Sequence, residues 1–217
     1  AETTYYGITR DQAGTDSPCS SVGISYVHDN IAPASPEFGD ISPTSPSNDS
    51  LTPVLSGTAE AGSWVHLYLS DDCTGDAIIE LDLEEGAFQT AAEGEEGGLV
   101  VDANSTTVYY STATDPAGNI SPCSSGLEYI HDNIAPDAPS IQSTSPESPS
   151  NQNEIAVIGS AEEGSTVDIY TDELCSLSSE PAGTGSSESF AVEGISSTVH
   201  EDATSYLYAT ATDAAGN

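Results

Sequence analysis

The stretch TTVYYSTATDPAGNISPCSSGLEYIHDNIAP, from Thr106 to Pro136, decides the fold because the chain repeats it. It has a counterpart upstream, TTYYGITRDQAGTDSPCSSVGISYVHDNIAP from Thr3 to Pro33, and it begins again as TSYLYATATDAAGN, which ends at Asn217. The histidines of the first two copies, His28 and His131, lie 103 residues apart. A period of about one hundred residues is too long for a solenoid unit and is the size of a β-sandwich domain.

Two further strings recur between these copies: LSGTAEAGSWVHLYLSDDC at Leu55–Cys73 and VIGSAEEGSTVDIYTDELC at Val157–Cys175. Large residues alternate with others in WVHLYL, from Trp64 to Leu69, and this period of two predicts half-buried β-strands. Clusters of Gly, Pro, Asn and Ser separate such runs at roughly 8–12 residues, and there is no convincing amphipathic helix. The sequence therefore predicts an all-β fold of tandem Greek-key β-sandwiches, with about seven strands per repeat.

The HDNIAP strings mark the expected domain boundaries, because an X-Pro pair holds the chain extended and ends the preceding strand. Residues 1–32 are expected to supply the last two strands of a preceding domain plus a linker, 33–135 a complete domain, and 136–217 a domain that lacks its final strand. A missing strand leaves an unpaired sheet edge. We therefore expect either a window cut from a longer array or donation of the missing strand by another chain.

The charge balance excludes several classes of partner. The chain has 36 Asp and Glu against a single Lys or Arg, for a formal net charge of −35. Such a surface repels nucleic acid and anionic lipid, whose phosphates are bound by Lys and Arg. No apolar run is long enough to insert into a membrane, and the four cysteines suggest an oxidising compartment. The acidic stretch Glu93–Glu96 is expected to be a solvated loop.

Three of the recurrent motifs together resemble bacterial immunoglobulin-like (Big-type) repeats. They are GTAEAGS with GSAEEGS, TATDPAGN with TATDAAGN, and DNIAP at the expected joints. The resemblance covers essentially the whole chain. It implies tandem immunoglobulin-like domains in a large adhesin or extracellular fibre at a bacterial surface, often with calcium at the joints. One departure is the string Asp11–Thr15, where Thr15 replaces the expected Asn.

Strand parity predicts where calcium would bind. Antiparallel alternation brings the turn at Ala59–Gly62 and the turn at Asp115–Asn119 to the linker end of the domain, and the following joint repeats this arrangement. The candidate ligands at the two joints are Asp29, Asn30, Glu60, Asp115 and Asn119, and then Asp132, Asn133, Glu162, Asp213 and Asn217. Calcium takes six to eight oxygen ligands with flexible geometry, so it suits such a cluster.

Calcium would bridge linker and turns and make a flexible string of neighbouring repeats stiff. Two alternatives stay open at this point. Asp-x-Ala-Gly-Asn is also a favourable tight turn without any metal, because Gly accepts φ > 0 and Asp or Asn bonds the local backbone. The overall acidity also fits adaptation to a salty medium.

The cysteines predict one disulfide, between Cys73 and Cys123, which belong to the same complete domain. The parity argument places Cys73 at the far end and Cys123 nearer the linker, which could exceed the Cα limit of about 7 Å. A bridge to a neighbouring chain and free thiols are the alternatives. Cys19 and Cys175 have no expected partner within the sequence.

No catalytic motif accompanies these features: there is no nucleophile elbow, P-loop, HExxH or dinucleotide fingerprint. We expect no enzymatic activity, although a carboxylate pair of the glycosidase kind is not excluded by counting. The leading hypothesis is a spacer segment of a bacterial surface adhesin or fibre, on the cell surface or secreted. A second hypothesis is a self-assembling filament in which other copies exchange domains or strands, and a third is an accessory module of a secreted hydrolase.

Overall fold

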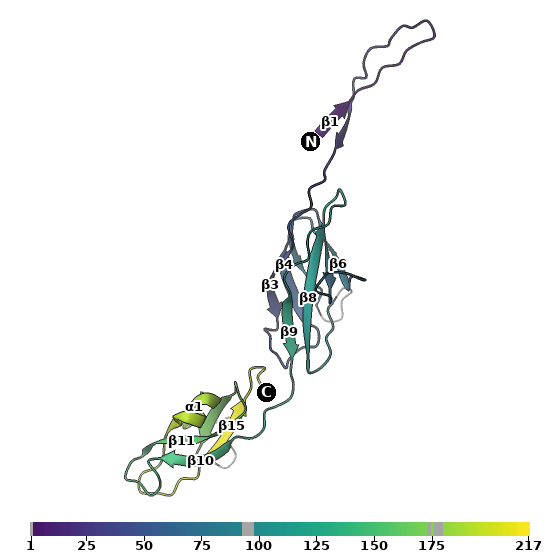
Figure 1. The fold of residues 1–217 in the computed structure, drawn as a ribbon. Helices are drawn as coiled ribbons and strands as arrows, with labels where there is room; N and C mark the ends of the chain where they lie inside the picture. Colours follow the sequence, from purple (N-terminus) through teal and green to yellow (C-terminus); the bar gives the residue numbers. More distant parts are fainter. Residues whose placement is uncertain (1, 93–97, 173–174, 176–179) are drawn as a thin grey trace. The chain divides into compact units, whose positions relative to one another are not determined.

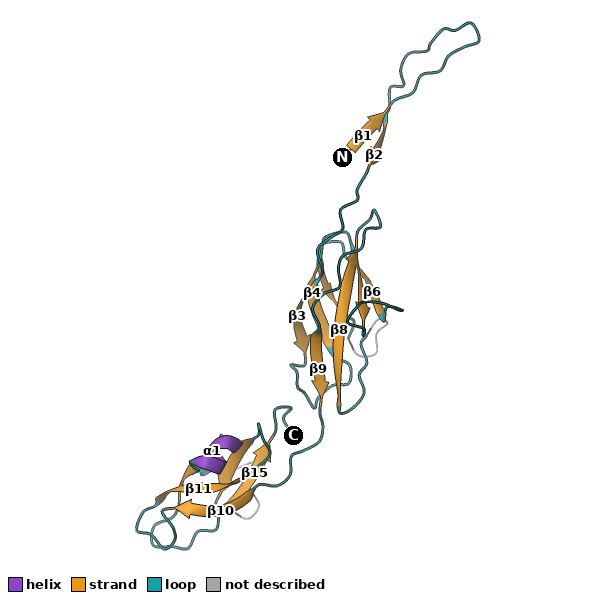
Figure 2. Cartoon of the chain, in the orientation of Figure 1, coloured by secondary structure: helices purple, strands orange, loops and turns teal. Residues whose placement is uncertain are grey.

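The computed structural model describes residues 2–92, 98–172, 175 and 180–217, so the expected loop at Glu93–Glu96 lies outside the described residues. The described part contains fifteen β-strands in antiparallel sheets and one short helix (Figures 1 and 2). The prediction of an all-β chain is confirmed. Among these residues, no helix is long and apolar enough to cross a bilayer.

Contacts between Cα atoms divide the chain into two compact units. The first comprises Ala1–Asp40, Leu55–Thr90 and Tyr109–Leu127, and the second comprises Ile41–Val54, Ala91–Val108 and Glu128–Asn217. This grouping follows spatial contacts, whereas the boundaries at 32/33 and 135/136 follow the sequence repeat. The three repeat-based domains therefore stay predictions.

The first strands form a hairpin of their own. Strands β1 (Glu2–Tyr5) and β2 (Ile24–Val27) pair antiparallel, and every residue in both is exposed. A two-stranded hairpin with no further layer is marginally stable in water.

In the segment predicted as the complete domain, the described residues form seven strands in two sheets. One sheet has the order β3 (Glu37–Ser42), β4 (Val54–Thr58), β7 (Ala87–Gln89). The other has the order β6 (Ile79–Asp82), β5 (Trp64–Tyr68), β8 (Ser105–Thr114), β9 (Leu127–His131). Leu55 of β4 and Phe88 of β7 are buried, as are Val65 and Leu67 of β5. Buried apolar residues thus come from both sheets, in a sandwich-like arrangement, and the predicted alternation in β5 is confirmed.

The last repeat has two three-stranded sheets. Their orders are β10 (Ser140–Ser145), β11 (Glu154–Ser160), β14 (Ile195–Thr198) and β13 (Gly183–Ser186), β12 (Thr166–Tyr170), β15 (Tyr208–Thr212). Its core cluster draws Val157 from β11, Val167 and Ile169 from β12, and Ile195 from β14. Both sheets therefore contribute to one hydrophobic core.

A six-residue helix, α1 (Ser187–Val192), was not predicted. The side chain of Ser186 caps it by accepting a hydrogen bond from the N–H of Ser189. Its buried Phe190 lies against Gly159, where a Cβ would collide with the ring, just as a Cβ on Gly57 would collide with Phe88 of β7. The helix thus supplies the same aromatic core position that a strand supplies in the preceding repeat. A helix of fewer than two turns is too short for its period to be detected in sequence.

The predicted Cys73–Cys123 disulfide is present, with a Cα–Cα distance of 5.7 Å. The parity argument overestimated this separation. Tyr68, the last residue of β5, pairs with Tyr110 of β8, and Ser124 bonds the backbone of the adjacent Ser111. The chain segments that carry the two cysteines therefore both lie beside Tyr110 and Ser111 of β8.

We expect Cys123→Ser to lower the free energy of unfolding by about 4 kcal/mol, because the bridge closes a loop of 50 residues and so restricts the unfolded chain. Chemical denaturation, with and without a reductant, measures the difference. Cys19→Ser is the matched control and should leave the midpoint unchanged, since Cys19 is exposed and unbridged. Equal stability of the two variants would contradict a structural role for the bridge.

Candidate functional site

The turn at Asp115–Asn119 is held together by one carboxylate. Oδ1 of Asp115 accepts hydrogen bonds from the N–H groups of Ala117, at 2.9 Å, and Asn119, at 2.8 Å. Its Oδ2 accepts from the side-chain amide of Asn119 at 2.7 Å. Gly118 has φ +90°, a conformation that disfavours residues with a Cβ. Asp thus supplies the acceptor of this turn, Gly allows its positive φ, and Asn adds a side-chain donor.

The turn at Asp213–Asn217 has the same structure. Oδ1 of Asp213 accepts from the N–H groups of Ala215 and Asn217, both at 2.9 Å, and Oδ2 accepts from the Asn217 amide at 2.9 Å. The string Asp-x-Ala-Gly-Asn thus specifies one hydrogen-bonded turn in both repeats, as the turn interpretation of the sequence predicts.

The carboxylates of the two linkers bond their own backbone. Oδ1 of Asp29 accepts from the N–H of Ile31, and Oδ1 of Asp132 accepts from the N–H of Ile134, each at 3.0 Å. These are Asx turns, in which the side chain replaces a backbone acceptor. Each of these carboxylates therefore bonds the backbone at the start of its linker.

An asparagine amide joins turn to linker at both joints. Nδ2 of Asn217 donates to the backbone carbonyl of Asp132 at 2.9 Å. Nδ2 of Asn119 donates to the carbonyl of Asp29 at 3.5 Å, which is beyond the usual range for an N–H···O bond. We call this contact the amide clamp. It links the backbone of Asp29 to the turn of Asp115 and Asn119, and the backbone of Asp132 to the turn of Asp213 and Asn217. The expected meeting of the carboxylates around an ion stays a prediction.

Asn48 completes the second joint and was missed by the sequence analysis. Its N–H donates to the carbonyl of Ala215 at 3.3 Å, and its Nδ2 donates to Oδ1 of Asn217 at 3.1 Å. The neighbouring Ser47 accepts from the N–H of Asp132 at 3.0 Å. The signal for this contact was the recurrence of Ser-Pro-Ser-Asn at 45–48 and 148–151.

The remaining candidate ligands lie elsewhere. The side chains of Glu60 and Glu162 are exposed, and their carbonyls accept from Ser63 and Ser165 to close a different turn. The N–H of Asn133 donates to Oδ1 of Asn104 at 2.8 Å. Asn30 is exposed. Among the described residues, no hydrogen bond joins the side chains of Asn30, Glu60, Asn133 or Glu162 to the joint carboxylates.

These side chains are arranged as hydrogen-bond acceptors and do not form a ready-made calcium cage. Within the described ranges, no group of three or more His, Cys, Asp and Glu side chains could hold a metal ion. The donated side-chain hydrogen bond from Asn119 holds the pKa of Asp115 below its usual value. Burial works against ionisation of Asp213, but the hydrogen bonds from Asn217, Ala215 and Gly216 outweigh it and lower its pKa. Calcium ligation stays a prediction.

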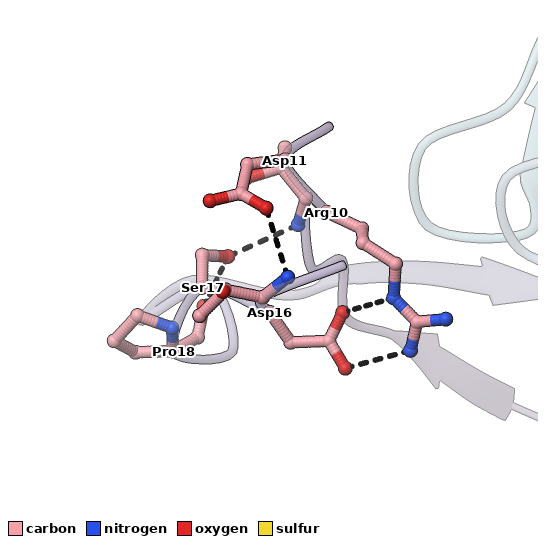
Figure 3. Close-up of polar contacts among 7 residues, drawn as sticks. Arg10, Asp11, Asp16, Ser17 and Pro18 are labelled. Carbon is pink, nitrogen blue, oxygen red and sulfur yellow. Dashed lines mark hydrogen bonds and ion pairs between the residues drawn. The ribbon is translucent and has the colours of Figure 1, made fainter. Parts of the chain in front are cut away.

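The hairpin provides an internal comparison (Figure 3). Thr15 stands where the other turns have Asn, yet its N–H still donates to Oδ1 of Asp11 at 2.9 Å. Arg10, the single cation of the chain, pairs instead with both carboxylate oxygens of Asp16, at 2.6 and 2.8 Å. This turn therefore folds without an asparagine amide. The amides of Asn119 and Asn217 each bond the turn carboxylate and also donate to the linker carbonyl.

A scan against protein-family models found no match for the chain, and a search of curated proteins found no similar sequence.

We expect Asn119→Ala to lower the melting temperature at neutral pH, and this difference from the wild type to shrink in acid. Because Asp115 has a lowered pKa in the folded state, its ionised form stabilises the fold above the unfolded pKa of about 3.9. This stabilisation of the fold is lost as the pH falls through the pKa that Asp115 has in the folded state.

Circular dichroism melts from neutral pH to about pH 3 test this, and the comparison with wild type cancels the general relief of charge repulsion in acid. Asn30→Ala is the control, because its side chain lies outside the turn. A difference that stays constant with pH would contradict the role given to the Asp115–Asn119 bond.

Proposed function

We propose that this chain is a structural spacer from a bacterial surface adhesin or extracellular fibre, built of tandem immunoglobulin-like repeats. In this proposal the amide clamp stabilises one geometry of each joint between repeats. One observation carries the proposal: at both joints an Asn amide from a repeated turn donates to the carbonyl of the linker Asp. A feature repeated once per module, and directed at the linker, suits spacing better than turnover.

The strength of the joint follows from the number of its hydrogen bonds. A neutral hydrogen bond contributes about 1 kcal/mol net. The second joint has the clamp at 2.9 Å and two further bonds from Asn48, and the clamp of the first joint is longer, at 3.5 Å. In this proposal such bonds favour one geometry of the joint, which still opens thermally.

The disulfide and the charge of the chain support an extracellular location. The Cys73–Cys123 bridge persists best in an oxidising compartment. The single cation already pairs with Asp16, so no basic patch is available for nucleic acid or anionic lipid. Neighbouring repeats of the same chain are the partners that this proposal requires.

Calcium at the joints is the alternative to the amide clamp within this proposal, and one substitution distinguishes the two. Asn119→Asp removes the donor to Asp29 and places a second carboxylate against Asp115. If hydrogen bonding holds the joint, this variant is destabilised by roughly 2–8 °C, and chelation leaves the wild type unchanged. If calcium holds the joint, the added carboxylate strengthens binding, and chelation lowers the melting temperature of the wild type.

Thermal melting and small-angle scattering, in calcium and then in chelator, measure both outcomes. Gln12→Glu is the matched control, since it makes the same amide-to-acid change at an exposed position away from the joints. If Asn119→Asp and Gln12→Glu behave alike in both media, neither the clamp nor calcium stiffens the joint, and the spacer proposal loses its support.

A further inference from the structure

Strand β5 carries a row of large side chains that point away from the core. Its core-facing residues, Val65 and Leu67, are fully buried. Because side chains alternate along a strand, Trp64, His66 and Tyr68 point to the opposite face of the sheet. Trp64 is the only tryptophan of the chain, and it is 36% exposed. The outer face of β5 is therefore rich in rings that lie outside the hydrophobic core.

Two carboxylates of β6 flank this row. Asp82 pairs with Trp64, and Glu80 pairs with His66. Opposed side chains on neighbouring strands have Cβ atoms about 5 Å apart. Both carboxylates are exposed, and Oε2 of Glu80 lies 3.6 Å from Nε2 of His66 while its side chain stays 64% exposed. An exposed ring and exposed carboxylates are therefore reached from solvent at the same place.

A second pair of rings extends the row towards β8. Tyr68 pairs with Tyr110 of β8, and both are half-buried. Trp64 and Tyr68 are four residues apart, so about 13 Å separates them along the strand. We call this surface the aromatic face, and its residues all lie in the first compact unit. They are Trp64, His66, Tyr68, Glu80, Asp82 and Tyr110.

The fold does not require a tryptophan at the position of Trp64. In the last repeat, Thr166 of β12 stands at the same register position. Each of the two residues pairs with a threonine of the next strand, Thr114 in β8 and Thr212 in β15. A threonine therefore suffices to form this strand, and the indole is an addition that packing of the sandwich does not explain.

The carboxylates of β6 are also particular to this repeat. Glu80 corresponds to Thr184 of β13 in the last repeat, and Asp82 corresponds to Ser186. Asp168 lies on the same face of the last repeat, but its Oδ1 accepts a hydrogen bond from Oγ1 of Thr184 at 2.6 Å. That carboxylate is already engaged, whereas those of β6 are exposed to solvent.

The charge of the aromatic face selects a cationic occupant. Glu80 and Asp82 flank the rings, and the whole chain has a formal charge of −35, so it attracts cations and repels anions. A Lys or Arg head group over an indole is also attracted by the ring itself. A neutral occupant would gain the ring contact but would desolvate the carboxylates without a counter-charge. Arg10, the one Lys or Arg of this chain, pairs with Asp16, so the occupant brings its own cations.

We propose that the aromatic face binds a basic segment of another protein in extended conformation, with two Arg side chains four residues apart over Trp64 and Tyr68. An extended peptide has the same rise per residue as β5, so its residues i and i+4 match the spacing of the two rings. Arg is preferred to Lys because its planar guanidinium stacks on a ring and pairs with a carboxylate through two hydrogen bonds. This inference goes beyond the spacer proposal and does not rest on it.

Trp64 reports occupancy of the aromatic face directly, because it is the single tryptophan and its fluorescence can be excited selectively. The purified chain is titrated with two peptides of equal composition and charge, one with Arg at i and i+4 and one with Arg at i and i+3. The i+3 spacing puts the second cation on the other face of an extended peptide. The first peptide should change the emission in a saturable way and bind about threefold more tightly. Equal affinity for the two peptides, or no change in emission, would overturn the proposal.

Substitutions separate the aromatic face from the general acidity of the chain. Asp82→Asn should weaken binding of the i+4 peptide about threefold. Asp40→Asn is the matched control, since Asp40 is exposed on β3 of the other sheet, and it removes the same charge with little effect. Trp64→Thr, which has the side chain that the last repeat carries there, should weaken binding about fivefold by calorimetry. Equal effects of the two Asp variants would show that only net charge matters and would contradict the proposal, whether or not Trp64→Thr folds.

A neutral glucose hexasaccharide tests the rival class of occupant, a glycan stacked on the rings. The proposal predicts no saturable change in Trp64 emission with this sugar. It also predicts that the i+4 peptide binds more weakly as salt screens the carboxylates. Saturable binding of the hexasaccharide, or peptide binding that salt does not change, would exclude a basic segment as the occupant of this face.

Discussion

With 36 carboxyl side chains and one Lys or Arg, this chain has almost no cationic side chain with which to stabilise its acidic turns. Arg10 is already committed to Asp16. Backbone N–H groups and asparagine amides therefore take the place of cations. Asp11, Asp29, Asp115, Asp132 and Asp213 each accept at least one backbone N–H. This pattern lets a highly acidic sequence keep ordered turns, because a carboxylate that accepts several N–H bonds stays ionised at little cost.

The joints extend the same principle from turn to linker. An Asn that already bonds the turn carboxylate has a second amide hydrogen, and it donates this hydrogen to the linker carbonyl. One side chain thereby couples the turn to the linker without a new charge. The turn at Thr15 in the hairpin shows that closing the turn and contacting the linker are separate roles, since this turn closes through the backbone N–H of Thr15 alone.

Many features of the fold and of the candidate site could be predicted from the sequence, because they depend on local sequence patterns. Period-two alternation located β5, whose buried residues Val65 and Leu67 are those that the pattern indicates, whereas in β12 Tyr170 is buried next to Ile169. Repeat position paired Cys73 with Cys123. The turn at Asp115–Asn119 and its approach to Asp29 followed from strand parity.

The remaining features depend on tertiary contacts that leave little trace in sequence. The Glu60 side chain points to solvent because its turn is closed by Ser63 through the backbone carbonyl, which parity does not reveal. Asn48 contacts Asn217 across a sequence separation of 169 residues, which no local pattern reveals. Helix α1 places Phe190 in the core beside Gly159, and a helix of fewer than two turns has no detectable period.

The most direct test of the account is the behaviour of the Asn119 side-chain amide in nuclear magnetic resonance spectra recorded in chelator and again in millimolar calcium. The account predicts that its two protons exchange with water more slowly than those of the exposed Asn30 in chelator, and that calcium changes neither their shifts nor their exchange. An Asn119 amide that exchanges as fast as that of Asn30 in chelator, with shifts at Asp29, Glu60 and Asp115 on adding calcium, would contradict it.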